Sequence, residues 1–515
     1  MVRPFSNEPL ASFLNDGNAG AMRAAIAKVR SQLGREYDLV IGGRRLRTEE
    51  KIRSVNPARP SEIVGIHQKA GQEHVQQAMQ AAVQAFESWK NTSAEERARL
   101  LFRIAGILRN RKFEFNAWMV LETGKNWDEA EADTCEAIDF CELYARAALH
   151  LDKAEPVAQL PGEKDSLRYI ALGAGAVIAP WNFPLAILCG MTTAAVVCGN
   201  TVTMKPSSDS PTIAAKFFEA MEVAGLPAGV VNFCPGSGAS FGHGIVEHPK
   251  TRFIAFTGSR DVGLDINLRA AKTQPGQIWI KRAILEMGGK DSIVVDVEAN
   301  LDAAVEGVAA SAFGFQGQKC SACSRVIVDE TVYDEFLVKL RERVAAIRVG
   351  DPAENAPMGP VINEGAMKSI LNYIEIGKRE GRLVCGGDRA SQNGYYIQPT
   401  VIADVAPGAR IAQEEIFGPV LAVIRANGFE DALEIANNTQ YGLTGAVYTS
   451  DIEKIERAKR DFHVGNLYIN RKCTGAVVGA HPFGGFNMSG TDSKAGGAEY
   501  LYLFSQAKSI GHRLG

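Results

Sequence analysis

The chain has 515 residues, 22% of them charged, and a formal net charge of −3. Because a single hydrophobic core stops growing at about 250–300 residues, we expect two or more domains. The charge pattern shows no basic face for nucleic acid, and no apolar run approaches the roughly 20 residues that cross a bilayer. Residues 1–18 are too polar for a signal peptide, so we expect a cytoplasmic protein without nucleic-acid or membrane partners.

The first third of the chain has the pattern of amphipathic helices. Apolar residues recur three or four apart over 73–90, which predicts a helix. The sequence Ser-Ala-Glu-Glu at 93–96 matches a capping box and predicts a helical region that runs toward Gly124. A further helix is expected over 133–150.

After residue 162, short apolar runs alternate with helical stretches, which predicts βαβ units and parallel sheets. Two α/β lobes are the simplest interpretation, with a boundary near 280–289, and the last thirty residues are expected to pack on another lobe or subunit. The predicted strands are 175–179, 201–204, 230–234 and 253–256 in the first lobe and 292–295, 325–328 and 421–424 in the second, where a helix is expected over 301–313.

Nine cysteines are scattered along the chain, which does not suggest a disulfide framework. Cys320 and Cys323 have C-x-x-C spacing, but no second pair or closely spaced histidines accompany them, so we expect no metal site. A free cysteine often serves as a small apolar residue, and a C-x-x-C pair can exchange disulfides. The polar neighbours Gln318 and Lys319 argue against deep burial of Cys320. A Cys320–Cys323 disulfide that would lock the first thiol is kept as a hypothesis.

Two other polar residues lie in settings that suggest chemistry. Glu286 is surrounded by apolar and glycine residues, where burial would raise its pKa and make it a usable general base. Asn182 lies between two prolines in Pro-Trp-Asn-Phe-Pro, a loop that could direct its amide at a developing negative charge. A surface glutamate and a merely rigid loop are the alternative interpretations.

Two glycine patterns could belong to a nucleotide site. The segment 235–242 is one residue away from the dinucleotide fingerprint and is weak evidence. Phe-Thr-Gly-Ser at 256–259 follows a predicted strand and precedes a predicted helix. Backbone amides at such a helix start can hold a pyrophosphate.

Taken together, seven motifs resemble the aldehyde dehydrogenase family. They span most of the chain in family order: P-W-N-F-P at 180–184, K-P-S at 205–207, F-T-G-S at 256–259, E-M-G-G-K at 286–290, G-Q-K-C at 317–320, E-E-I-F-G-P at 414–419 and P-F-G-G-F at 482–486. Within the family, the long N-terminal extension and the segments 313–321, 462–468 and 470–476 are most similar to the bacterial L-glutamate γ-semialdehyde (1-pyrroline-5-carboxylate) dehydrogenases.

The resemblance implies an α/β fold with three parts. An N-terminal extension and a Rossmann-like cofactor-binding domain would comprise 1–152 and 171–284, and a catalytic α/β domain 285–480. A small oligomerisation element would comprise a hairpin at 153–170 and the segment 481–515. A homodimer or a higher homo-oligomer is therefore expected.

The resemblance also assigns catalytic roles. Cys320 would be the nucleophile, Asn182 an oxyanion donor and Glu286 the general base. A thiohemiacetal on Cys320 would lose hydride to the cofactor, and the resulting thioester would be hydrolysed to a carboxylate. The expected reaction oxidises L-glutamate 5-semialdehyde, in equilibrium with 1-pyrroline-5-carboxylate, to L-glutamate in proline degradation.

NAD is the expected cofactor. The family pattern places seven residues around it, namely Lys205, Ser208, Gly258, Ser259, Gly288, Glu415 and Phe417. Many members that prefer NAD carry glutamate where this chain has Ser208, and its charge repels the 2′-phosphate of NADP. We therefore expect NADP to be excluded less strongly than usual.

Six residues are carried over to the substrate. Gly475 and Ala476 would grip the α-carboxylate through backbone amides, with Ser321 near the same end, while Glu136 would hold the α-amino group. Phe183 and Phe483 would enclose the aliphatic chain.

Three alternatives remain open at this point. Another semialdehyde, such as succinate semialdehyde, could be the substrate, and a rate comparison separates the two. A non-catalytic relative is disfavoured by the joint presence of Cys320, Glu286 and Asn182. A cysteine hydrolase would need a histidine partner for Cys320 and turnover without cofactor.

Overall fold

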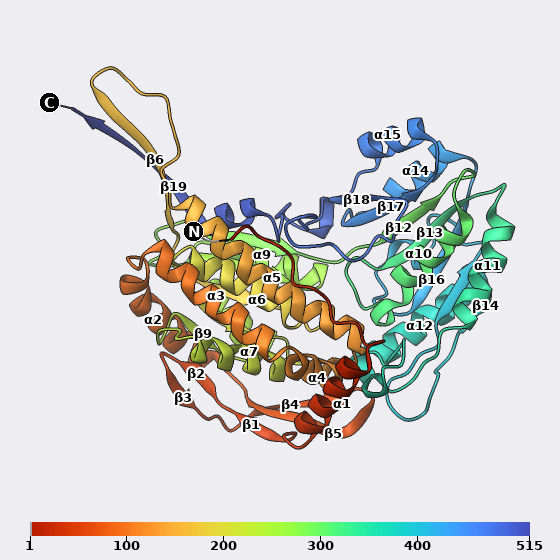
Figure 1. The fold of residues 1–515 in the computed structure, drawn as a ribbon, viewed down its shortest axis with the longest axis horizontal. Helices are drawn as coiled ribbons and strands as arrows, with labels where there is room; N and C mark the ends of the chain where they lie inside the picture. The colour runs from red at the N-terminus through yellow and green to blue at the C-terminus, as the bar shows by residue number, and fades with distance from the viewer. Residues whose placement is uncertain (1–2, 515) are drawn as a thin grey trace.

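Two seven-stranded sheets form the centres of the two lobes of the computed structural model, which describes residues 3–514 (Figure 1). The first sheet is parallel from β11 to β9, and the short strands β2 and β3 extend it antiparallel. Its order is β11 (Arg282–Glu286), β10 (Phe253–Thr257), β7 (Ala174–Ile178), β8 (Thr201–Lys205), β9 (Val231–Phe233), β2 (Leu39–Ile41) and β3 (Arg44–Leu46).

The second sheet is parallel except for its edge strand β14. Its order is β14 (Arg382–Cys385), β15 (Thr400–Ala403), β16 (Val420–Ala426), β13 (Cys323–Asp329), β12 (Asp291–Val295), β17 (Thr444–Tyr448) and β18 (Asn466–Ile469). The chain passes from the first sheet to the second between Glu286 and Asp291. The predicted strands and the α/β fold class are confirmed.

Helices cover the sheets of both lobes. In the first lobe they are α2 (Gln72–Trp89), α3 (Ala94–Asn110), α4 (Lys112–Thr123), α5 (Trp127–Leu151), α6 (Ala186–Val197), α7 (Pro211–Val223), α8 (His243–Glu247) and α9 (Arg260–Ala271). In the second they are α10 (Leu301–Phe313), α11 (Tyr333–Ala345), α12 (Glu364–Glu380), α13 (Arg410–Gln413), α14 (Phe429–Asn437) and α15 (Ile452–Asp461). The helix α5 packs against both α3 and α6 (Figure 1). Within the described chain, no helix has the length and apolar character needed to cross a membrane.

The helix predictions are confirmed with changes at their ends. Ser93 caps α3 as predicted, since its hydroxyl accepts from the Glu96 N–H while the Glu96 carboxylate accepts from the Ser93 N–H. The helical region up to Gly124 is divided into α3 and α4 at Arg111, whose φ of −112° is not helical. Helix α5 begins at Trp127, earlier than the predicted residue 133, because Asn126 caps it by accepting from the Glu129 N–H.

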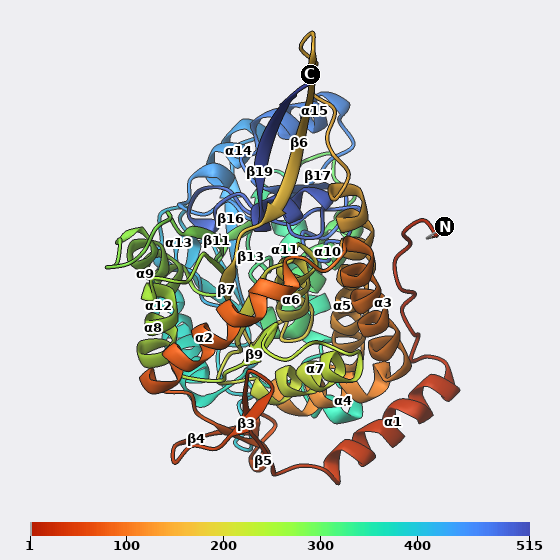
Figure 2. The same ribbon diagram turned by 90° about the vertical axis from the view of Figure 1, so that its left-hand side faces the viewer.

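Three smaller elements complete the fold. A three-stranded sheet contains β1 (Arg35–Tyr37), β5 (Arg59–Gln68) and β4 (Lys51–Asn56). The strands β6 (Glu163–Ala171) and β19 (Ser505–Arg513) form an antiparallel ribbon that projects from the first lobe (Figures 1 and 2). At the other end of the chain, an extended segment runs along α5 before α1 (Asp16–Arg30) begins (Figure 1).

The C-terminal tail packs on the first lobe, as predicted for the last thirty residues. Arg282 of β11 donates to the carbonyls of Tyr502 and Leu503, and the Met287 N–H donates to the Ser489 carbonyl. The tail therefore lies against the strand that carries Glu286.

Candidate active site

Cys320 follows a turn with an uncommon backbone. After α10 ends at Phe313, three consecutive residues have left-handed φ angles, namely Phe315 at 48°, Gln316 at 58° and Gly317 at 67°. Each non-glycine residue in that region costs about 1–2 kcal/mol. The Gln316 amide offsets part of this cost by donating to the Gly124 carbonyl at 3.1 Å and the Pro360 carbonyl at 2.7 Å. Cys320 is thus presented by a turn that tertiary contacts hold in place.

Replacing Gly317 with alanine is expected to lower the free energy of unfolding by about 2–4 kcal/mol. The alanine would have to adopt the positive φ of Gly317, and its Cβ would lie 2.3 Å from the Gly418 carbonyl oxygen. Gly314→Ala is the matched control, because its φ of −57° suits any residue. Denaturant unfolding of both variants measures the difference. Equal stability of the two would contradict the strain assigned to this turn.

Asn182 is buried beside the Cys320 turn. It lies in the loop that leaves β7, where 4% of its surface is exposed, and its Nδ2 donates to the Gln318 carbonyl at 3.1 Å. Since Gln318 lies two residues before Cys320, this hydrogen bond holds the Asn182 side-chain amide close to the cysteine. The remaining N–H of the amide is free to face an oxygen that forms next to the thiol.

Glu286 is the last residue of β11 and is held by the C-terminal tail. Ser493 donates its hydroxyl to Oε1 at 2.5 Å, whereas Oε2 has no hydrogen-bond partner among residues 3–514. Burial raises the pKa of Glu286 to about 8, although the Ser493 bond and the Lys494 charge oppose this. The carboxyl therefore has the proton affinity of a general base that works near neutral pH. Sequence patterns had not indicated Ser493.

A cavity of about 750 Å³ opens on one side of Cys320. Phe417, with a φ of 57°, makes a T-shaped contact with Trp181, in which the ring centroids are 5.5 Å apart. Asn182 also lines this cavity. All seven residues expected around a dinucleotide lie on its wall: Lys205, Ser208, Gly258, Ser259, Gly288, Glu415 and Phe417.

Three features of the larger cavity fit a dinucleotide. Ser259 is the N-cap of α9, and no side-chain cap occupies its first N–H groups, which can hold a pyrophosphate. The Lys205 ammonium is buried and, among residues 3–514, donates only to the neighbouring Pro206 carbonyl, at 3.4 Å, so it is available for ribose hydroxyls. The Glu415 carboxylate is held by the Gly289 N–H at 3.0 Å.

A smaller cavity of about 120 Å³ lies on the other side of Cys320. Glu286 lines it, and Cys320, Thr257 and Met287 line both cavities. All six residues expected at the substrate lie on its wall: Glu136, Phe183, Ser321, Gly475, Ala476 and Phe483. The structure thus brings all sixteen predicted site residues to two adjoining cavities.

Two carboxyl groups, those of Glu136 and Glu286, line the smaller cavity. Burial and the negative charge of Asp133 raise the pKa of Glu136 to about 8. An ammonium group bound beside Glu136 would lower that pKa and favour the carboxylate. Lys125, which the sequence had not indicated, is buried with its Nζ 3.5 Å from Asp133 Oδ2 and 4.2 Å from the centre of the Phe183 ring.

The Cys320 thiol is half-buried. Burial raises its pKa well above the usual value, and the charges of Asp291, Glu415 and Glu286 add to the increase. Cys323 is buried and donates its thiol to the Arg325 carbonyl at 3.2 Å. Both are free thiols, and the disulfide between them stays a hypothesis.

A free thiol between a dinucleotide-sized cavity and a smaller one fits an oxidoreductase that acts on a carbonyl group. The family model for the aldehyde dehydrogenase family matches residues 45–510, and the chain belongs to this family.

Several highly similar proteins are 1-pyrroline-5-carboxylate dehydrogenases. The chain is 59% identical over 511 residues to the 1-pyrroline-5-carboxylate dehydrogenase of Geobacillus thermodenitrificans (strain NG80-2), covering 99% of each sequence. It is 55% identical over 515 residues to that of Bacillus cytotoxicus, covering 100% of each. The solved structure of 1-pyrroline-5-carboxylate dehydrogenase from Thermus with bound NAD superposes with a TM-score of 0.98 at 52% identity, covering 99% of both chains. The fold and family predictions are confirmed.

Proposed function

We propose that the protein oxidises L-glutamate 5-semialdehyde, which forms from 1-pyrroline-5-carboxylate, to L-glutamate with NAD in proline degradation. The observation that carries the proposal is the position of Cys320, which lines both cavities while Asn182 and Glu286 flank it. The similarity to 1-pyrroline-5-carboxylate dehydrogenases over nearly the whole chain supports this substrate, and the NAD in the Thermus structure supports the cofactor.

The first half of the reaction forms a covalent intermediate on Cys320. The Cys320 thiol first loses its proton to water. The thiolate sulfur then attacks the aldehyde carbon, a C–S bond forms, and the carbonyl oxygen becomes an oxyanion. The Asn182 amide and the Cys320 N–H stabilise this oxyanion, and one such donor contributes about 3–4 kcal/mol. Bound NAD supplies the hydride acceptor, held by the seven residues of the larger cavity. Loss of hydride from the carbon leaves a thioester on Cys320.

The second half releases the product through Glu286. Its unpartnered Oε2 takes a proton from water, the water oxygen attacks the thioester carbon, and the C–S bond breaks to give a carboxylate and the free thiol. Ser493 holds the opposite oxygen, Oε1, so the carboxyl keeps its orientation during the proton transfer.

The smaller cavity recognises the amino-acid end of the substrate. The N–H groups of Gly475 and Ala476 bind the α-carboxylate, and Ser321 lies near it. The Glu136 carboxylate binds the α-ammonium group, while the rings of Phe183 and Phe483 enclose the methylene chain. Gly475 suits the loop because its φ is 76°.

The experiment that tests the proposal compares two substrates. Steady-state NADH formation is measured with L-glutamate 5-semialdehyde and with succinate semialdehyde, which has a carboxylate but lacks the α-carbon and its amino group. We expect the glutamate derivative to have a kcat/KM at least about 100-fold higher, because succinate semialdehyde leaves Glu136 unpaired. A preference for succinate semialdehyde would overturn the proposed substrate.

Deacylation is expected to accelerate as the pH rises through about 8. Burial raises the pKa of Glu286 to about 8, and only its ionised form accepts a proton from water. At pH 7 roughly one tenth of the carboxyl is ionised, so the rate should increase about tenfold by pH 9. Single-turnover decay of the acyl-enzyme between pH 6 and 10 measures this dependence, and a flat profile would contradict the role of Glu286.

NADP is expected to support turnover with an efficiency within about a thousandfold of NAD, or about 4 kcal/mol. Ser208 is exposed on the wall of the larger cavity and carries no charge to repel a 2′-phosphate. Ser208→Glu should lower kcat/KM for NADP at least about tenfold relative to NAD, while Ser208→Gln, of equal length without charge, should keep the wild-type ratio. Wild-type discrimination beyond a thousandfold would contradict this prediction.

We also propose a division of the chain into domains, an oligomeric assembly and a cellular location. We assign cofactor binding to 1–152 and 171–284, catalysis to 285–480, and oligomer formation to 153–170 and 481–515. The projecting β6–β19 ribbon supports a homodimer or higher homo-oligomer, since its nine residue pairs leave the outer edge of β19 open to another subunit, whereas Glu155 pairs with Leu167 on the β6 edge. The cytoplasm is the proposed location.

A further inference from the structure

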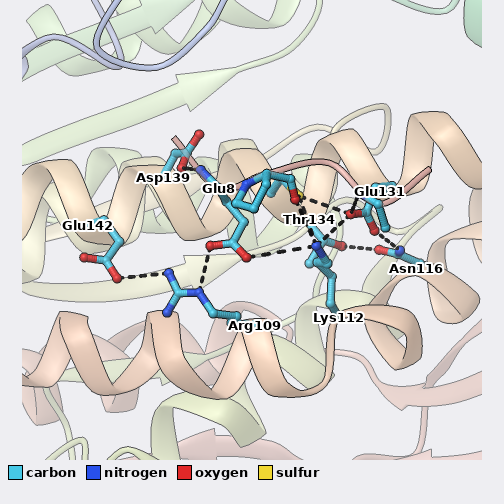
Figure 3. A network of polar contacts seen from close by, with 11 residues as sticks. Glu8, Arg109, Lys112, Asn116, Glu131, Thr134, Asp139 and Glu142 are labelled. Carbon is cyan, nitrogen blue, oxygen red and sulfur yellow. Dashed lines mark hydrogen bonds and ion pairs between the residues drawn. The ribbon is translucent and has the colours of Figure 1, made fainter. Parts of the chain in front are cut away.

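An extended segment near the start of the chain, residues 3–13, lies along α5, and we call it the N-terminal strap. Figure 3 shows its polar contacts with α5 and the neighbouring helices. The Glu8 carboxylate accepts from Arg109 at 2.7 Å, and Arg109 also reaches Glu142 of α5 at 3.1 Å. Further along, the Ala11 N–H donates to Glu131 at 2.7 Å. These contacts fix the strap to α5 at several points.

Asn7 joins the strap to two segments that line the smaller cavity, namely α5 and the loop that contains Gly475 and Ala476. Its Nδ2 donates to Oδ2 of Asp139 on α5 at 2.8 Å and to the carbonyl of Val478 at 2.9 Å. The Glu8 N–H donates to the other Asp139 oxygen at 2.7 Å, which orients the carboxylate toward Asn7. The Phe5 ring lies over Gly479, where a Cβ would be 2.8 Å from the ring edge. The strap thus packs closely on the chain that follows Ala476.

The two partners of Asn7 belong to the two halves of the proposed amino-acid site. Asp139 lies one helical turn after Glu136, whereas Val478 lies two residues after Ala476. The bridge through Asn7 therefore sets the spacing between the carboxylate that binds the α-ammonium group and the loop that binds the α-carboxylate. A second, longer link runs from Tyr144 of α5 through Gly496 to Gly479.

We propose that Asn7 is a positioning residue that makes the enzyme selective for aldehydes of α-amino acids, by holding the 475–478 loop at a fixed distance from Glu136. This inference rests on the proposed function. Asn7 touches neither reacting atoms nor cofactor, so the chemistry at Cys320 does not depend on it. Its effect is confined to substrates that engage both the loop and Glu136.

The test is steady-state kinetics of Asn7→Ala with L-glutamate 5-semialdehyde and with propanal, which has neither an α-carboxylate nor an α-amino group. Asn7 is exposed, so the variant should fold normally. We expect the KM for the glutamate derivative to rise about 5- to 20-fold, since two hydrogen bonds are lost while the Tyr144 link remains. Its kcat, and both constants for propanal, should change less than about twofold.

Glu8→Gln is the matched control on the same strap. It removes the charge that pairs with Arg109 but keeps the Glu8 N–H bond to Asp139 and leaves Asn7 in place. Its KM should stay within about twofold of the wild type. The double variant Asn7→Ala with Asp139→Asn should have the same KM for L-glutamate 5-semialdehyde as Asn7→Ala alone, because Asp139 acts on the loop through Asn7.

The outcomes separate this inference from the proposed function. A wild-type enzyme that does not prefer L-glutamate 5-semialdehyde over propanal would overturn both. If that preference is found, an unchanged KM in Asn7→Ala overturns the inference alone. An equal loss of kcat/KM with the two aldehydes also overturns it, because that result indicates general destabilisation.

Discussion

Replacing Cys320 with alanine is expected to lower kcat/KM at least about 10⁴-fold, since no other group can carry the acyl intermediate. The side chain lines both cavities, and its removal leaves the walls of the larger cavity intact. NAD should therefore bind Cys320→Ala with nearly wild-type affinity. NADH formation and NAD titration by protein fluorescence measure the two quantities.

Cys323→Ala provides the control for this prediction. Cys323 is the neighbouring thiol, is buried, and bonds to a carbonyl of its own strand, away from both cavities. The Cys323→Ala variant should retain a kcat/KM within a few-fold of the wild-type value. Loss of activity in Cys323→Ala with normal turnover in Cys320→Ala would contradict the assignment of the nucleophile.

Replacing Glu286 with glutamine is expected to slow steady-state turnover about 10²- to 10⁴-fold while the first turnover survives. Glutamine has the shape of glutamate and can still accept the Ser493 hydrogen bond, so the site should keep its geometry. Its amide cannot take a proton from water, and the thioester on Cys320 should accumulate. Stopped-flow measurement should show a burst of about one NADH per active site, followed by a stall.

The matched control is Glu330→Gln, an exposed glutamate that follows β13 in the second lobe. It should turn over at the wild-type rate without a stall. Slow NADH formation in Glu286→Gln from the first turnover would mean that the carboxyl acts before hydride loss, and would contradict its role in hydrolysis.

Local patterns were sufficient to predict most of the fold. Helix α10 spans the predicted residues 301–313, and β8, β12 and β13 lie within one or two residues of their predicted bounds. In these elements, the apolar residues that produce the sequence pattern are the residues that the structure buries. The three catalytic candidates and most of the two ligand sets lie in motifs of the family, whereas Glu136 and Ser208 lie outside them. The structure brings all of these residues to the two cavities at Cys320.

The features that the sequence did not predict depend on contacts between distant segments. Ser493 lies 207 residues after Glu286 in a polar, glycine-rich tail, and no local pattern indicates that its hydroxyl would meet the carboxylate. Asn7 and Val478 are 471 residues apart. Residues 3–13 have no regular periodicity, so their course depends on hydrogen bonds to α5, Arg109 and Val478 and on the packing of Phe5 against Gly479.

The turn before Cys320 shows why propensity alone fails at such a site. Phe and Gln rarely adopt left-handed φ angles, so residue preferences favour a continued helix or an ordinary loop. The hydrogen bonds of Gln316 to Gly124 and Pro360 stabilise the uncommon conformation. Strained backbone of this kind is typical of functional sites, where the surrounding structure maintains it.

The most direct test of the central claim is the mass of the Cys320 peptide from Glu286→Gln after mixing with L-glutamate 5-semialdehyde and NAD. We expect one glutamyl group on Cys320, formed together with about one NADH per active site, as covalent catalysis requires. An unmodified Cys320 after NADH has formed, or a glutamyl group on another residue, would contradict the proposed function of this thiol.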